Sequence, residues 1–185
     1  LTDIARERGV DAFDALLDLA LDEPDLALRV RIVVLNDDAA EVSALLTEDH
    51  CTLGLSDAGA HVGQLCDAPQ ATDFLGNWVR DRGLMSIEAG VRKLTGVQAD
   101  LFGFADRGYL RTGAAADVVV FDPDTVAPGP VRRVRDFPAD GERLTADAPV
   151  GMNHIVVNGT PVQIDGRRVE DAGRPGQIVR PAARS

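Results

Sequence analysis

The chain has 185 residues, of which 45% are hydrophobic and 26% are charged, so its composition is that of a globular protein and not of a disordered or fibrous one. At this length a sizeable core can form without disulfide or metal staples. Thirty acidic residues against nineteen basic ones give a formal net charge of −11, which argues against nucleic acid or an anionic membrane surface as a partner.

Two further features bear on the setting of the chain. No apolar run approaches the ~18 residues of a membrane span, and no basic-then-apolar signal opens the sequence, so the expected location is the cytoplasm. The two cysteines, Cys51 and Cys66, form no CxxC pair. Because the chain starts at Leu1 and its only methionines are Met85 and Met152, we expect it to be part of a longer product.

The first part of the chain predicts helices and two buried strands. Amphipathic spacing over the first twenty residues predicts a helix that is interrupted at Gly9 and restarts at Asp11. The β-branched run 29–35 predicts a strand, residues 38–49 predict a capped helix, and the run 51–56 predicts a second strand. Such a strand-helix-strand unit is typical of a parallel α/β sheet.

The pattern changes near residue 105. Before it, two helices are expected, the first ending at Gly83 and the second at Gly96, each with a left-handed glycine cap. After it, short strands are expected, and the dipeptides Asn158-Gly159 and Asp165-Gly166 predict tight hairpin turns between them. The strands are predicted over 108–110, 118–121, 154–157, 161–164 and 178–180. The stretch 123–149 contains five prolines and is expected to be a long irregular surface excursion.

Asp57 is the principal candidate for chemistry. It stands where the predicted strand 51–56 ends and a glycine-rich loop begins, and the carboxyl ends of parallel strands are where α/β folds carry their sites. Capping of the loop or of the next helix is the structural alternative.

The sequence resembles the amidohydrolase superfamily, in particular its branch of N-acyl-D-amino-acid deacylases. Four stretches carry the resemblance: Gly54 to Asp57, Gly83 to Gly96, Asp106 to Gly113 followed by Ala116 to Asp122, and Val156 to Gly159 with Gly173 to Gly176. The resemblance implies an α/β fold in which residues 1–105 are the last strand-helix units of a (β/α)8 barrel. Residues 106–185 are then strands of the accessory β-sandwich.

The resemblance also implies a metal-dependent hydrolase that cleaves amide C–N bonds of small molecules such as N-acyl amino acids. Asp57 is then both a metal ligand and the proton carrier. His61 is a candidate by position alone: it lies in the same loop four residues later, where it could contact substrate or a metal-bound water, and a loop histidine without a special role is the alternative. The ion is a divalent metal, zinc by family likeness, present singly or as a pair. Its other ligands are not found in this chain, because His50, His61 and His154 include no His-x-His pair.

Alternatives remain open at this point. Thr112, Ala89-Gly90 and the loop 58–69 depart from the family pattern, so a cyclic amide or imide is a second substrate class, and a non-catalytic module derived from the fold is a third interpretation. A catalytic thiol at Cys66 lacks a partner base. We expect the isolated chain to be inactive and to self-associate, because part of a barrel exposes strand edges and apolar helix faces.

Overall fold

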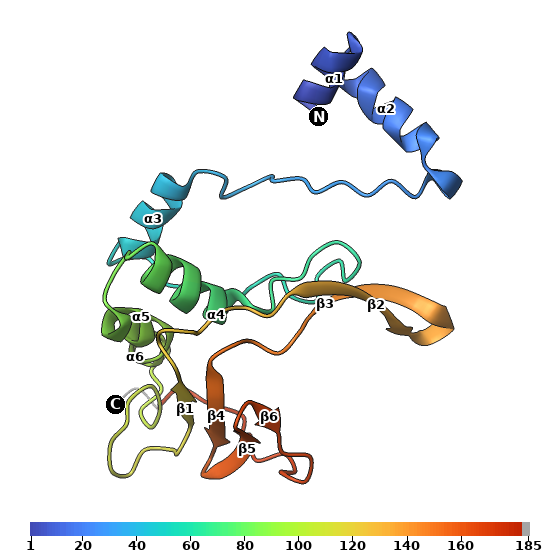
Figure 1. Ribbon diagram of the computed structural model, residues 1–185. Helices are drawn as coiled ribbons and strands as arrows, with labels where there is room; N and C mark the ends of the chain where they lie inside the picture. Colours follow the sequence, from blue (N-terminus) through green and yellow to red (C-terminus); the bar gives the residue numbers. More distant parts are fainter. Residues whose placement is uncertain (183–185) are drawn as a thin grey trace. The chain divides into compact units, whose positions relative to one another are not determined.

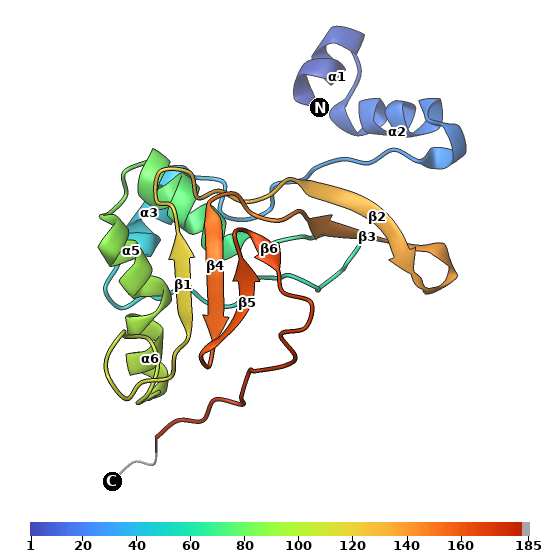
Figure 2. The same cartoon turned by 60° about the horizontal axis from the view of Figure 1, so that its bottom comes forward.

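The computed structural model describes residues 1–182 (Figures 1 and 2). It divides into two compact units, Leu1–Ala39 and the chain from Ala40 onward, which are described separately. No helix formed by the described residues combines the length and the apolar character needed to cross a bilayer.

The first unit contains the two helices expected from the sequence. α1 spans Thr2–Arg8 and ends at Gly9, whose φ of 68° is the left-handed conformation of a glycine cap. α2 spans Ala12–Asp22, and the Asp11 carboxylate accepts a hydrogen bond of 2.8 Å from the backbone N–H of Phe13. A short 3-10 turn, η1, follows over Pro24–Leu26. The predicted helix interruption and restart are confirmed.

The parallel strand pair predicted from the sequence is not formed. Neither 29–35 nor 51–56 is a strand, and only the helix between them is present, as α3 over Ala39–Thr47. Large apolar side chains in both stretches are exposed, Val34 to 77% and Leu55 to 98%. β-branched residues favour extended backbone, but a strand also needs a hydrogen-bonded neighbour, and the described residues supply none to these stretches.

Helices dominate the second unit up to residue 102. α4 (Gln70–Asp73) runs into η2, a π-helical segment over Phe74–Asp81, and α5 and α6 follow over Ile87–Leu94 and Gly96–Phe102. Gly83 has the predicted left-handed conformation, with φ of 62°. Gly96 does not; it begins α6, and a Cβ there would lie 2.6 Å from the ring of Tyr109. The close approach of that ring, not a cap, requires the glycine.

The end of the chain forms an antiparallel sheet. Its four strands are β1 (Val118–Phe121), β4 (Met152–Val157), β5 (Thr160–Ile164) and β6 (Arg167–Arg168), side by side in that order (Figure 2). Asn158-Gly159 and Asp165-Gly166 all have positive φ, as the predicted tight turns require. The predictions of strands over 108–110 and 178–180 are wrong, because neither stretch pairs with a described residue.

The proline-containing stretch 123–149 is not irregular throughout. It contains a hairpin of β2 (Val131–Phe137) and β3 (Gly141–Ala146), joined by a 3-10 turn, η3, over Pro138–Asp140 (Figure 1). The prolines fall outside the two strands, where they remove no ladder hydrogen bond. The prediction of a long surface excursion is therefore wrong over this part.

The core of the second unit joins its helices to the region after β1. Phe74, Leu75 and Val79 of η2 are buried together with Val126, which has no exposed surface. A Cβ on Gly76 would lie 2.3 Å from the Val126 carbonyl oxygen, so only glycine allows this approach. Arg80 Nη1 also donates a hydrogen bond of 2.6 Å to the same oxygen. The helices and the chain that follows β1 are thus held together at Val126.

Candidate functional site

Asp57 lies on an exposed, irregular segment of the second unit between α3 and α4. Its backbone carbonyl accepts a hydrogen bond of 3.0 Å from the N–H of Ala60, which closes a turn directly after it. Among residues 1–182, no hydrogen bond or ion pair engages its carboxylate. The side chain is therefore available for chemistry.

The segment that leads to Asp57 is held by side chains of the following helices. Lys93 Nζ in α5 donates to the carbonyl of Cys51 at 2.9 Å, and Gln98 Nε2 in α6 donates to the carbonyl of Leu53 at 2.7 Å. Gln98 also bonds the hydroxyl of Thr52 at 2.7 Å. These donors satisfy backbone acceptors that a neighbouring strand would otherwise satisfy. The ammonium group of Lys93 is thus engaged by a backbone carbonyl.

The loop that follows Asp57 contains two successive turns. His61 has a positive φ of 48°, and its carbonyl accepts hydrogen bonds from Gln64 at 2.7 Å and from Leu65 at 3.1 Å. The His61 side chain is exposed. Asp57 and His61 thus lie in one loop and both are exposed.

The β2–β3 hairpin contacts this loop, which runs beside β3 in Figure 1. The backbone N–H of Leu144 donates to the carbonyl of Val62 at 2.7 Å, and Arg133 Nη1 donates to the carbonyl of Gly63 at 3.0 Å. The pKa of Arg143 is raised, mainly by its hydrogen bond to Asp136 and to a smaller extent by Cys66 of the loop. Nothing in the sequence pattern predicted this contact, because it joins segments about 70 residues apart.

The remaining sequence candidates do not join Asp57. His154 lies in β4, where its Nδ1 accepts a hydrogen bond of 3.3 Å from the backbone N–H of Asp165 in the turn between β5 and β6. Cys51 and Cys66 are both free and partly buried. Within residues 1–182, no group of three or more histidine, cysteine, aspartate or glutamate side chains is placed to hold a metal ion.

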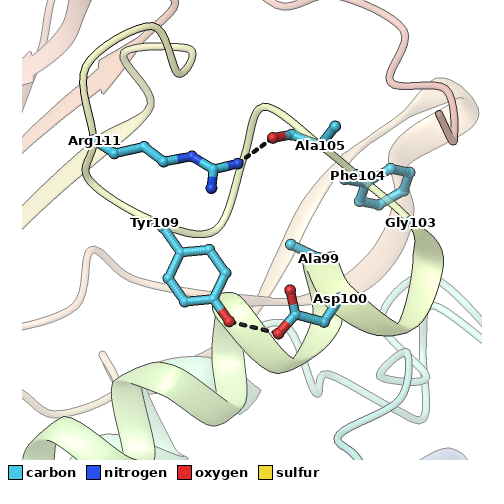
Figure 3. A pocket seen from close by; sticks show the side chains of 7 residues that line it. All are labelled: Ala99, Asp100, Gly103, Phe104, Ala105, Tyr109 and Arg111. Atoms are coloured by element: carbon cyan, nitrogen blue, oxygen red, sulfur yellow. Dashed lines mark hydrogen bonds between the residues drawn. The ribbon is translucent and has the colours of Figure 1, made fainter.

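A separate pocket of about 310 Å³ lies where α6 meets the chain before the sheet (Figure 3). The Tyr109 hydroxyl points to Asp100 and donates a hydrogen bond of 2.5 Å to its carboxylate, and Arg111 donates to the carbonyl of Ala105. The hydrogen bond to Asp100 and partial burial raise the pKa of Tyr109. These contacts join α6 to the start of the sheet region, and none of the lining residues belongs to the Asp57 loop.

Comparison with known proteins identifies the family. The model of the amidohydrolase family matches residues 3–163. The chain belongs to the amidohydrolase family. This confirms the resemblance seen in the sequence.

Three relatives of this amidohydrolase chain are deacylases. It is 42% identical over 113 residues to N-acyl-D-glutamate deacylase from Alcaligenes xylosoxydans xylosoxydans, covering 59% of this chain and 20% of the relative. It is 30% identical over 184 residues to N-acyl-D-aspartate deacylase from the same organism, covering 94% and 33%. A solved N-acyl-D-glutamate deacylase from Bordetella bronchiseptica, in complex with zinc and a phosphonate inhibitor, is 43% identical, with a TM-score of 0.42 and coverage of 59% and 20%. The chain thus spans a fifth to a third of these relatives.

Proposed function

We propose that this chain is part of a hydrolase that cleaves the amide C–N bond of N-acyl-D-amino acids. The observation that carries the proposal is the 42% identity to an N-acyl-D-glutamate deacylase over 113 residues, within a chain matched by the amidohydrolase family over residues 3–163. Because the chain spans a fifth of that relative, the activity is proposed for the whole enzyme and not for these residues alone.

We further propose that residues 1–105 supply the last strand-helix units of a (β/α)8 barrel and that residues 106–185 belong to an accessory β-sandwich. The exposed apolar side chains of the extended stretches support this arrangement: Ile32 is 72% exposed and Leu35 is 78% exposed. In parallel sheets both faces of a strand are covered, so such side chains suit strands that pack against further strands and helices of the same barrel.

Asp57 is the proposed catalytic residue. Its exposed carboxylate is not engaged by another described residue, so it can accept the proton of the attacking water and deliver it to the leaving amine as the C–N bond breaks. His61, on the same loop, is the proposed contact to substrate. Both roles need side chains that are accessible from outside the chain, and both residues are exposed.

The proposed cofactor is a divalent metal, zinc, which would polarise the amide carbonyl and acidify the attacking water. The described residues do not form a site for it, since a catalytic zinc takes about three protein ligands and no such group is gathered within residues 1–182. We assign Asp57 one ligand position, with the other ligands supplied from outside these residues.

The test is hydrolysis of a substrate panel by the full-length enzyme. We expect release of D-glutamate, D-aspartate or a neutral D-amino acid from its N-acetyl derivative, and no release from the L-enantiomers or from cyclic imides. Asp57→Asn should lower kcat by about 10²- to 10⁴-fold, because it removes the proton acceptor. Asp67→Asn, an exposed aspartate ten residues later, is the matched control and should keep wild-type turnover. Unchanged kcat in Asp57→Asn would refute the assignment.

A further inference from the structure

The loop after Asp57 has a support that comes from outside its own segment. Residues 57–66 contain two turns, and two consecutive carbonyls within the second turn, those of Val62 and Gly63, accept hydrogen bonds from the β2–β3 hairpin. One donor is the backbone N–H of Leu144 on β3, and the other is the guanidinium of Arg133 on β2. The loop is therefore tied to an element that the chain forms about 70 residues later.

Arg133 is itself held in place before it reaches the loop. Glu142 on β3 accepts a hydrogen bond of 2.7 Å from the same Nη1 atom, and the two side chains are only 28% and 23% exposed. A half-buried ion pair of this kind fixes the guanidinium, so its bond to the Gly63 carbonyl loses little side-chain freedom. Arg132, the preceding residue on β2, pairs instead with Asp147 within the hairpin region.

We propose that Arg133 is a positioning residue: through its bond to Gly63, the hairpin sets the position of His61 relative to Asp57 and thereby shapes the binding of the acylated amino acid. This inference rests on the proposed function. Arg133 touches the loop and not the substrate, and it acts at a backbone carbonyl two residues after His61.

The expected effect of Arg133→Ala on kcat and KM depends on which of the two site residues, Asp57 or His61, the hairpin supports. Asp57 lies before the supported part of the loop, and the segment leading to it is fixed separately by Lys93 and Gln98. Loss of the Arg133 bond should therefore disturb the His61 side of the site and leave proton transfer by Asp57 intact. We expect Arg133→Ala to lower kcat/KM by about 5- to 10-fold, mostly as a higher KM.

Two measurements test the inference in parallel. The first is hydrogen–deuterium exchange of residues 58–66 in the full-length enzyme, where Arg133→Ala should speed amide exchange by about 5- to 10-fold. Arg133→Lys keeps one charged donor and should fall between wild type and Arg133→Ala. Arg132→Ala is the matched control, since it removes an equal charge from the same strand without a bond to the loop. The second is kcat and KM of the full-length enzyme carrying the same variants.

The outcomes separate this inference from the proposed function. Faster loop exchange with a raised KM in Arg133→Ala, partly restored by lysine and absent in Arg132→Ala, supports it. Unchanged loop exchange overturns it, as does faster exchange with wild-type KM. If Arg133→Ala unfolds the hairpin, exchange will be fast throughout residues 131–146. In that case the loop exchange and KM of Arg133→Lys are used instead, with the same results supporting or overturning the inference. A wild-type enzyme without deacylase activity refutes the proposed function, and with it the substrate role of Arg133, while the exchange data still decide whether Arg133 holds the loop.

Discussion

At the scale of single residues, the contact between Tyr109 and Asp100 shows how one hydrogen bond can join two parts of a unit. Tyr109 lies in a stretch that the sequence predicted to be a strand over 108–110, and its hydroxyl instead reaches back to α6. The ring also lies against Gly96, the residue predicted to be a helix cap. Local pattern identified the glycine, but its reason is a tertiary contact that no local pattern contains.

The hydroxyl of Tyr109 should titrate above the ordinary tyrosine pKa of about 10, because the Asp100 carboxylate accepts its proton in a hydrogen bond. It is the only tyrosine of the chain, so tyrosinate absorbance reports it alone. Asp100→Asn should lower the pKa. Since the folded pKa is raised, the stabilising effect of the bond is complete below about pH 10 and is lost as the pH rises through the folded pKa. An identical titration in wild type and Asp100→Asn would contradict the contact.

At the scale of elements, the sequence predicted best what is decided locally. The interruption between α1 and α2, the cap at Gly83 and both positive-φ turns of the sheet follow from short motifs, and all are present. The β2–β3 hairpin was missed because the five prolines of 123–149 indicated an irregular stretch, although none of them lies within either strand. In the structure its arginines and acids form cross-strand pairs such as Arg143 with Asp136 at 2.7 Å.

The packing of η2 against the region after β1 gives an element-scale prediction. Gly76→Ala should destabilise the second unit by about 1–3 kcal/mol, because the new Cβ would lie 2.3 Å from the Val126 carbonyl and the buried backbone must shift. Gly54→Ala is the control, since its Cβ would meet no atom within 4 Å. Urea unfolding of both variants is the measurement. Equal urea midpoints for the two variants would show that the close approach of Gly76 to Val126 does not contribute to stability.

At the scale of the whole molecule, the candidate site could be predicted only in part. Asp57 was selected by position and resemblance and His61 by its place in the same loop, and the structure adds that both residues are exposed. The contact between that loop and the β2–β3 hairpin could not be predicted from the sequence. It includes a hydrogen bond between the backbone N–H of Leu144 and the carbonyl of Val62, and such backbone groups are the same in every non-proline residue. The strands expected over 29–35 and 51–56 depend likewise on partners at a distance in the fold.

The isolated chain should self-associate through its exposed apolar stretches. Four consecutive apolar side chains are each more than 60% exposed, those of Ile32, Val33, Val34 and Leu35. An exposed apolar stretch of extended backbone can pair with the same stretch of another copy. We expect sedimentation velocity to show oligomers that grow with concentration. Replacing Ile32 and Val34 by lysine should reduce them, whereas Ile178→Lys, at an equally exposed site, should not. A monodisperse wild-type monomer would contradict this prediction.

The tie between the Gly63 carbonyl and Arg133 has a practical consequence for protein engineering. A loop grafted in place of residues 57–66 would lose this support unless its backbone also presents carbonyls to Leu144 and Arg133. Successful chimaeras should carry both segments together, and libraries that vary the loop should diversify residues 131–146 alongside it.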